Sequence, residues 1–171
     1  MKSTSAYNVL LVDDSPNILK ALKRTFAHEG YNLHTAESAR EAMDIIKAQK
    51  IDLVIVDENM PETSGSELLS ALRTFNPEIV RIMVSGMNDV NVLKNAVNKG
   101  EIYRFFSKPW DDFELLISVR YALEAKAERE MCRKLKDTLK HQNEMIRQLE
   151  KDHPGIAGKN LSVDGAFILD E

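Results

Sequence analysis

Ile51-Asp-Leu-Val-Ile-Val-Asp-Glu-Asn-Met-Pro61 is the most informative stretch of this sequence. A short apolar run leads directly into Asp57, and Pro61 prevents the strand from continuing. Such a run, bounded by a strand breaker, is typical of a fully buried strand in a parallel sheet. Asp57 would then stand at the carboxyl end of that strand, where open α/β sheets bind their ligands.

Apolar runs elsewhere predict four more strands, at residues 8–12, 31–35, 79–84 and 103–106. Helical spacing predicts helices between them, from Pro16 to near Gly30, after Ser38, after Ser64 and over 90–99. Ser38 with Glu41 three residues later predicts a capping box. Strands that alternate with helices indicate an α/β fold. We predict a flavodoxin-like, doubly wound, five-stranded parallel sheet of order 2-1-3-4-5.

Composition narrows the class of protein. The 171 residues carry a net charge of −4 and are 43% hydrophobic, which is ordinary for a globular protein and gives no indication of nucleic acid as a partner. No apolar run approaches the ~20 residues that span a bilayer, and the first residues do not resemble a secretory signal. Cys132 is the single cysteine, which excludes an intrachain disulfide. We therefore expect a reduced, cytoplasmic protein without membrane association.

Polar residues follow four of the predicted strands. Asp13 and Asp14 follow the first strand, Asp57 the third, Ser85 the fourth and Lys108 the fifth. Because the carboxyl ends of parallel strands meet at one edge of the sheet, we expect these side chains to lie close together. Each residue by itself is usually a cap or a turn residue. The combination, with each residue type after the appropriate strand, indicates a site.

Carboxylates gathered at one edge repel one another unless a cation lies between them. Oxygen ligands favour a hard ion, so we predict Mg²⁺ bound by Asp13, Asp14, Asp57 and the backbone carbonyl of Asn59. A carboxylate can also attack phosphorus and form an aspartyl phosphate, and Asp57 is the candidate.

The oxygens of such an aspartyl phosphate would need partners. Lys108 would bind one phosphoryl oxygen as a point charge, and the Ser85 hydroxyl would donate to another. Positioning and charge stabilisation of this kind are the usual basis of phosphoryl transfer. The residues therefore predict a carboxylate that accepts a phosphoryl group.

Four segments resemble the receiver domain of bacterial two-component response regulators: Leu-Val-Asp13-Asp14, Val-Asp57-Glu-Asn-Met-Pro61, Val-Ser85-Gly86 and Phe105-Phe-Ser-Lys108-Pro109. The resemblance covers residues ~7–122. It implies that Asp57 is the phosphoacceptor, that a sensor histidine kinase is the donor and that the acidic pair holds Mg²⁺. It also implies that Ser85 and Phe105 form the switch. A receiver of this kind catalyses its own phosphorylation and dephosphorylation, so we expect no turnover enzyme.

Two other functions stay open. An Asp-nucleophile phosphatase of the haloacid-dehalogenase kind shares the nucleophile, magnesium and lysine, but usually has a second Asp where this chain has Asn59. A scaffold with the receiver fold that is never phosphorylated is the other, although the complete acidic, hydroxyl and lysine set argues against it. Since no output domain is recognisable, a downstream protein partner or a further domain would carry the signal.

The last helix, expected from Asp111, continues past the end of the receiver. Good helix formers extend to Pro154 without Gly or Pro, so we predict a receiver at 1–122, a helical extension at 123–152 and a tail at 153–171. In the tail, Asp164-Gly165 between apolar flanks predicts a β-hairpin at 159–170.

Heptad spacing in the extension predicts a coiled coil. The a and d positions are Cys132, Leu135, Leu139, Gln142, Ile146 and Leu149. The heptad pattern favours a parallel homodimer through 123–152. Met131 and Met145 widen the stripe beyond a simple two-stranded seam, so a broader bundle or a helical partner stays open. Interspersed charges favour a solvated outer face over a nucleic-acid interface.

Overall fold

The structure is a computed structural model that describes residues 6–86 and 102–154. The chain divides into two compact units, Met1–Lys126 and Ala127–Glu171. The strands of the first unit are β1 (Asn8–Val12), β2 (Asn32–Ala36), β3 (Leu53–Asp57), β4 (Val80–Ser85) and β5 (Arg104–Ser107). The helices are α1 (Pro16–Thr25), α2 (Ala39–Ala48), α3 (Gly65–Phe75) and α5 (Asp112–Asp152), of which α5 runs into the second unit. The helix predicted over 90–99 lies outside the described residues.

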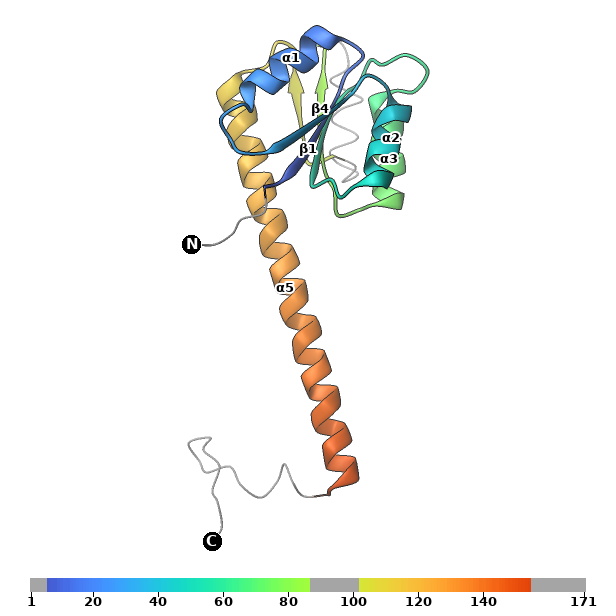
Figure 1. Ribbon diagram of the computed structural model, residues 1–171, viewed down its shortest axis with the longest axis vertical. Coiled ribbons are helices and arrows are strands. Elements are labelled where there is room, and N and C mark those ends of the chain that lie inside the picture. Colours follow the sequence, from blue (N-terminus) through green and yellow to red (C-terminus); the bar gives the residue numbers. More distant parts are fainter. Residues whose placement is uncertain (1–5, 87–101, 155–171) are drawn as a thin grey trace. The chain divides into compact units, whose positions relative to one another are not determined.

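The five strands form one parallel sheet of order β2-β1-β3-β4-β5, which confirms the predicted fold (Figure 1). Strand β3 lies between β1 and β4, and all its residues are buried. Val56 is in register with Val12 on one side and Met83 on the other. Asp57 therefore stands at the carboxyl end of a central strand.

Helices cover both faces of the sheet, as Figure 1 shows. Helices α2 and α3 pack on one face over Leu10 and Val54. Helix α1 and the first turns of α5 pack on the other over Val9, Leu11 and Ile55. Because successive side chains of a strand point to opposite faces, a strand covered on both sides must be apolar at nearly every position. This is why residues 53–56 form an unbroken apolar run.

Helix N-termini differ in how fully their caps form. Ser64 and Glu67 at the start of α3 make a complete capping box. At α2 the predicted box forms by half: the Ser38 hydroxyl accepts from the Glu41 N–H at 3.2 Å, but the Glu41 carboxylate accepts from the N–H of Glu37 at 2.8 Å. The carboxylate thus reaches one residue further back, and the extra acceptor still satisfies a free backbone donor ahead of the helix.

Helix α1 is shorter than its apolar spacing predicts. It ends at Thr25, and turns lead to Gly30, whose φ is 70°. Glycine adopts this left-handed conformation without the steric penalty of a Cβ. Gly30 thus marks the reversal of the chain into β2 and not the end of the helix, and β2 begins at Asn32, one residue later than predicted.

A buried ion pair fastens α5 to the start of the central strands. The Nζ of Lys126 lies 2.6 Å from Oδ1 of Asp52, and the two residues are 3% and 7% exposed. The second oxygen of Asp52 accepts from the backbone N–H of Asn8 at 3.0 Å. Buried charges persist only when they are paired and hydrogen-bonded, and both conditions are met here.

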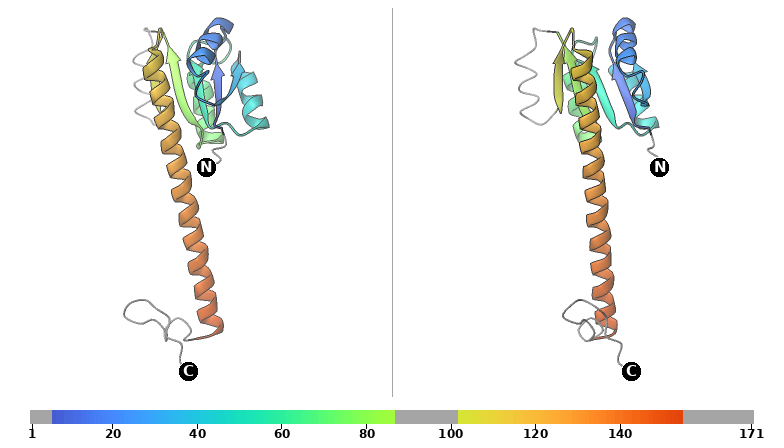
Figure 2. Two further views of the ribbon diagram at one scale, coloured as in Figure 1. Left: turned by 60° about the vertical axis from the view of Figure 1, so that its left-hand side comes forward. Right: turned by 90° about the vertical axis from the view of Figure 1, so that its left-hand side faces the viewer.

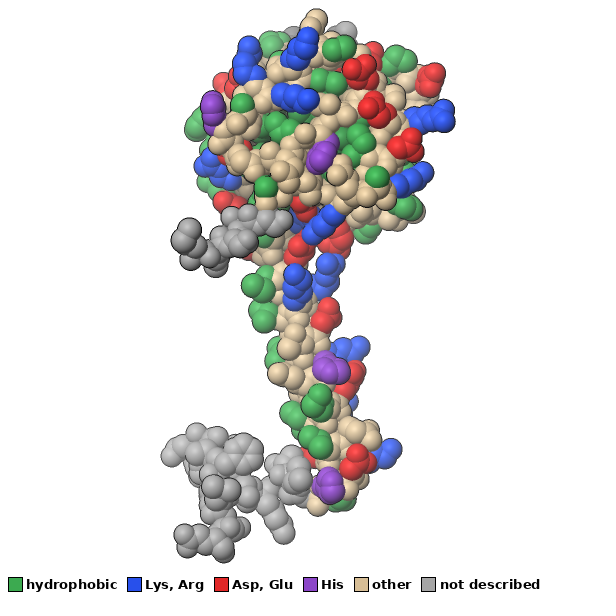
Figure 3. Space-filling model, viewed as in Figure 1, with side chains coloured by type: hydrophobic (Ala, Val, Ile, Leu, Met, Phe, Trp, Pro, Cys, Tyr) green, Lys and Arg blue, Asp and Glu red, His purple; other side chains and the backbone are tan. Residues whose placement is uncertain are grey.

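The described part of the second unit is the remainder of α5, which is one continuous helix in all views (Figures 1 and 2). Its large apolar side chains are between 47% and 60% exposed, and Figure 3 shows hydrophobic side chains beside charged ones on the helix surface. Among described residues, neither hydrophobic core includes a residue beyond Leu123. The hairpin predicted at 159–170 lies outside the described residues. Within residues 6–86 and 102–154, no helix is long and apolar enough to cross a membrane.

Candidate functional site

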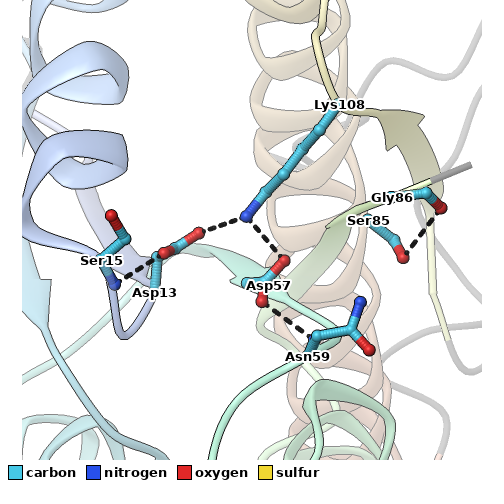
Figure 4. Close-up of polar contacts among 7 residues, drawn as sticks. All are labelled: Asp13, Ser15, Asp57, Asn59, Ser85, Gly86 and Lys108. Atoms are coloured by element: carbon cyan, nitrogen blue, oxygen red, sulfur yellow. Dashed lines mark hydrogen bonds and ion pairs between the residues drawn. The ribbon is translucent and has the colours of Figure 1, made fainter.

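Asp13, Asp57 and Lys108 meet at the carboxyl end of the sheet (Figure 4). The Nζ of Lys108 lies 2.7 Å from Oδ2 of Asp13 and 2.8 Å from Oδ1 of Asp57. The two carboxylates are 2% and 5% exposed, and the lysine side chain is 25% exposed. One ammonium therefore bridges two buried carboxylates that come from different strands.

The second oxygen of each carboxylate accepts a hydrogen bond from the local backbone. The N–H of Asn59 donates to Oδ2 of Asp57 at 2.9 Å, and the N–H of Ser15 donates to Oδ1 of Asp13 at 2.9 Å. Aspartate commonly bonds to the backbone two residues on, and such a bond fixes the orientation of the carboxylate. Both acids are thus held from two sides before any ligand binds.

The backbone ladder continues past the strands and aligns the site. The N–H of Lys108 donates to the carbonyl of Ser85 at 2.7 Å, and the N–H of Glu58 donates to the carbonyl of Val84 at 3.1 Å. These bonds follow directly on the paired ends of β3, β4 and β5. The position of each functional residue is therefore set by sheet register.

Gly65 lets α3 begin directly against the backbone of Asp57. A Cβ at Gly65 would overlap the carbonyl oxygen of Asp57, and the Gly65 N–H donates to the carbonyl of Glu58 at 3.0 Å. The Glu58 carboxylate in turn accepts from the N–H and hydroxyl of Ser66 at 2.8 Å. Sequence reasoning did not include Gly65 in the site. The available signal was a glycine in the first turn of a helix, where its low helix propensity needs a reason.

The other predicted site residues lie around this centre. Ser85 is buried at the end of β4, and its hydroxyl donates to the carbonyl of Gly86 at 3.4 Å, a long hydrogen bond. Figure 4 shows Asp57 between Asp13 and Ser85, as the order of their strands requires. Phe105 is partly buried against the core on the α2 and α3 face, and Asp14 is exposed.

The electrostatics of the pair are asymmetric. Burial raises the pKa of Asp13, and its hydrogen bonds from Lys108 and from the Ser15 N–H oppose that rise without cancelling it. Burial alone would lower the pKa of Lys108, but the hydrogen bonds to Asp13 and Asp57 outweigh it, so the pKa of Lys108 is raised. The two carboxylates therefore hold Lys108 in its charged form, while burial disfavours the charged form of Asp13.

The donors at this edge are of the kind that magnesium prefers. Carboxylate oxygens of Asp13 and Asp57 and the backbone carbonyl of Asn59 are all hard oxygen ligands. Burial is the main cause of the raised pKa of Asp13, and a cation bound beside this carboxylate would favour its charged form. In the part of the chain that the structure describes, no three His, Cys, Asp or Glu side chains are grouped closely enough to hold a metal ion. Two acids are brought together, and Asp14 is not grouped with them.

Comparisons with known proteins agree with this architecture. Residues 9–120 match the family model of the response regulator receiver domain. The chain is 38% identical over 117 residues to the hydrogenase transcriptional regulatory protein HoxA of Cupriavidus necator. This alignment covers 68% of this chain and 24% of HoxA. It is 30% identical over 169 residues to the nitrogen assimilation regulatory protein NtrX of Azorhizobium caulinodans. That alignment covers 94% of this chain and 37% of NtrX.

A solved structure is similar over nearly its whole length. The signal receiver domain of an HD domain-containing protein from Pseudomonas fluorescens Pf-5 has a TM-score of 0.68 and 37% identity, and the match covers 72% of this chain and 98% of that one. The curated relatives are much longer, since the chain spans only 24% of HoxA and 37% of NtrX. The match to HoxA is about as long as the receiver domain, whereas the match to NtrX also extends beyond residues 9–120 of this chain.

Proposed function

Since the chain belongs to the response regulator receiver domain family, we propose that it accepts a phosphoryl group on Asp57 from a sensor histidine kinase. The observation that carries the proposal is the buried pair of carboxylates bridged by Lys108 at 2.7 and 2.8 Å. A nucleophilic carboxylate needs a nearby cation to stabilise the charge of an incoming phosphoryl group, and Lys108 is in position to supply it.

In the proposed reaction an oxygen of Asp57 forms a bond to phosphorus as the bond between phosphorus and the donor's imidazole nitrogen breaks. The electron pair of the broken bond stays on the imidazole. Lys108 moves from pairing with the carboxylate to pairing with a phosphoryl oxygen, and the buried Ser85 hydroxyl donates to another. The N–H of Asn59, already bonded to Asp57 at 2.9 Å, holds the carboxylate in orientation.

Receiver domains generally use magnesium, and we propose that Asp13, Asp14, Asp57 and the carbonyl of Asn59 hold Mg²⁺ here. The ion would offset the negative charge that the acids and the phosphoryl group bring together. The two buried carboxylates of Asp13 and Asp57, which share the single ammonium of Lys108, support this assignment.

We propose a phosphoryl acceptor and not a turnover phosphatase. A phosphatase with an aspartate nucleophile needs an acid to protonate the leaving group, and Asn59 two residues after Asp57 has no acidic proton to give. The amide of Asn59 thus supports the transfer of one phosphoryl group to each chain rather than repeated hydrolysis of a substrate.

The proposed output is a rearrangement that passes from Asp57 to Ser85 and Phe105. Ser85 stands at the end of the neighbouring strand, and Phe105 is one strand further and only partly buried. Attraction of the Ser85 hydroxyl to the phosphoryl group would free space that the Phe105 ring can fill. A protein partner would read the changed surface, and the extension at 123–152 would join two copies in a homodimer.

The test is phosphorylation by a small phosphodonor such as acetyl phosphate with Mg²⁺, followed by intact mass. We expect one phosphoryl group on the wild type and none on Asp57→Asn, because an amide is not a nucleophile toward phosphorus. Asp44→Asn, on the surface of α2, is the matched control and should still be phosphorylated. Equal incorporation by Asp57→Asn would overturn the proposal.

A further inference from the structure

We propose that residues 131–150 of α5 form a parallel, in-register, two-stranded coiled coil with a second copy of this chain, and that Gln142 pairs with its own counterpart to set that register. This inference rests on the homodimer of the proposed function and specifies its geometry. The apolar stripe, the polar residue within it and the residues that flank it carry the argument.

The stripe is apolar, exposed and heptad-spaced. Its large side chains, each between 47% and 60% exposed, are Met131, Leu135, Leu139, Met145, Ile146 and Leu149. Helices in proteins gain most of their stability from packing such a face, and a seven-residue repeat fits a helix with the same repeat. A second copy of the chain necessarily has that repeat. Its a and d side chains can therefore insert between the a and d side chains of the first copy.

Gln142 indicates which helix packs on the stripe and whether that helix runs parallel or antiparallel to α5. It lies at a d position in the middle of the stripe, where a coiled coil would bury its amide. A buried amide without a hydrogen-bond partner is destabilising. In a parallel, in-register dimer, Gln142 of one chain is level with Gln142 of the other. Each amide has a donor and an acceptor, so the two can pair.

An antiparallel arrangement gives Gln142 no such partner. Antiparallel packing places each d residue opposite an a residue of the other chain, and the a residues are Cys132, Leu139 and Ile146. In every antiparallel register the amide therefore faces an apolar side chain or a thiol. A helix of a different protein would have to carry a matching polar group at the same level of an otherwise apolar seam.

The flanking positions permit self-association in parallel. Each g residue faces the e residue five positions later on the other chain, and the pairs are Met131 with Lys136, Thr138 with Asn143 and Met145 with Glu150. None of these pairs brings like charges together. Thr138 already donates to the carbonyl of Lys134 at 2.9 Å, so it needs no partner across the seam. It also interrupts the third apolar column that a broader bundle core would require.

Cys132, the single and exposed cysteine, is a native reporter of chain direction. It lies at an a position, so a parallel, in-register dimer brings the two thiols face to face across the seam. In the antiparallel register that pairs residue 132 with residue 149, the two cysteines are about 25 Å apart at ~1.5 Å per residue. A disulfide needs Cα atoms about 4.4–6.8 Å apart.

The experiment uses the full chain, with molar mass from light scattering and cross-linking by copper–phenanthroline or a short bismaleimide. We expect a dimer whose Cys132 cross-links about tenfold faster than Cys132→Ala/Arg133→Cys, which places the thiol on the outer face, because the seam raises the effective concentration. Wild type is then mixed with a tagged Cys132→Ala/Leu149→Cys chain. A parallel dimer gives only 132–132 and 149–149 products.

Several outcomes would overturn the inference: a monomer, a trimer or larger assembly, a 132–149 product, or a dimer in which neither pair cross-links. Gln142→Leu provides a second test, since removing the amide pair should increase dimer affinity and reduce the share of 132–132 products. An unchanged product ratio would contradict the role of Gln142. Asp57 phosphorylation is scored separately by mass, so a phosphorylated monomer refutes only the coiled coil, and an unphosphorylated dimer refutes only the acceptor function.

Discussion

The two halves of α5 carry similar apolar residues in opposite surroundings. In the first half, Leu115, Val119 and Leu123 are at most 1% exposed, because they pack on the sheet. In the second half, Leu135 and Leu139 are each 58% exposed. Apolar residues recur at helical spacing in both halves. The spacing therefore predicts an apolar face on the helix but does not predict what packs against it.

The two apolar faces also lie at different heptad positions. Counted in the register of the exposed stripe, Leu115, Val119 and Leu123 fall at e, b and f, which are outer positions of a coiled coil. One helix thus packs one face on its own sheet, and the face that we propose for a second chain is a different one. A change on one face should leave the other intact, and this separation can be tested.

The largest difference should come from two lysines of α5. Lys126→Ala removes the 2.6 Å partner of the buried Asp52 carboxylate and leaves it with the exposed Lys50 at 3.7 Å, so we expect the receiver to lose up to about 3–5 kcal/mol of unfolding free energy. Lys136→Ala on the exposed half should change it by no more than about 0.5 kcal/mol. Urea unfolding followed by fluorescence of Trp110, the single tryptophan, reports on the first unit. Similar midpoints for the two variants would mean that the buried ion pair does not anchor α5.

Leucines on the two faces should differ in their dependence on concentration. Leu123→Ala, in the receiver core, should destabilise the first unit by about 2–5 kcal/mol at any protein concentration. Leu139→Ala should leave the Trp110 transition nearly unchanged and raise the dimer dissociation constant, measured by analytical ultracentrifugation. A dissociation constant that Leu139→Ala does not alter would contradict the use of the exposed face.

Within the receiver, the two glycines near the site should differ. Gly65→Ala inserts a Cβ against the Asp57 carbonyl, so we expect a loss of about 1–3 kcal/mol and slower phosphorylation. Among the residues that the structure describes, no atom lies within 4 Å of a Cβ built at Gly86, so Gly86→Ala should change stability less. Thermal unfolding of both variants checks this, and an equal change would show that α3 can shift away from Asp57 without penalty.

The smallest effect should be one of pH. Because the pKa of Asp13 is raised in the folded protein, its protonation stabilises the fold below the ordinary pKa of an aspartate, 3.8, and that stabilisation is lost as pH rises through the folded pKa. Asp13→Asn, which does not titrate, should therefore be more stable than wild type near neutral pH without Mg²⁺. The gap should narrow as pH falls. Melting temperatures across pH test this, with Asp137→Asn on the exposed half as control; a gap that widens on acidification would contradict it.

The apolar runs were sufficient to predict the sheet, and the polar residues at the strand ends were sufficient to predict the family; both predictions are confirmed. Continuous apolar strands require cover on both faces, and alternation with helices then leaves few possible topologies. Boundaries were less predictable: α1 ends at Thr25 and not near Gly30, since apolar spacing continues into turns that pack on the core. The structure brings Asp13, Asp57 and Lys108 together, but the roles of all the site residues stay predictions, as does Mg²⁺.

Asp52 and Gly65 show what sequence reasoning missed. An aspartate in an apolar run and a lysine 74 residues later gave no sign of pairing, yet they form the buried ion pair with a 2.6 Å contact. The contact of Gly65 with the Asp57 carbonyl likewise depends on where α3 begins against β3. Both are consequences of packing between segments and not of local pattern.

The sequence by itself determined which residue types stand at the strand ends, because apolar runs and breakers are local and the parallel fold brings their carboxyl ends to one edge. Tertiary structure alone decided that Lys108 bridges Asp13, a residue 95 positions away, and Asp57 at the same time. It also decided which half of α5 is buried. Contact distances between such distant residues depend on strand register and on helix packing. Neither can be read from the spacing of residues along the chain.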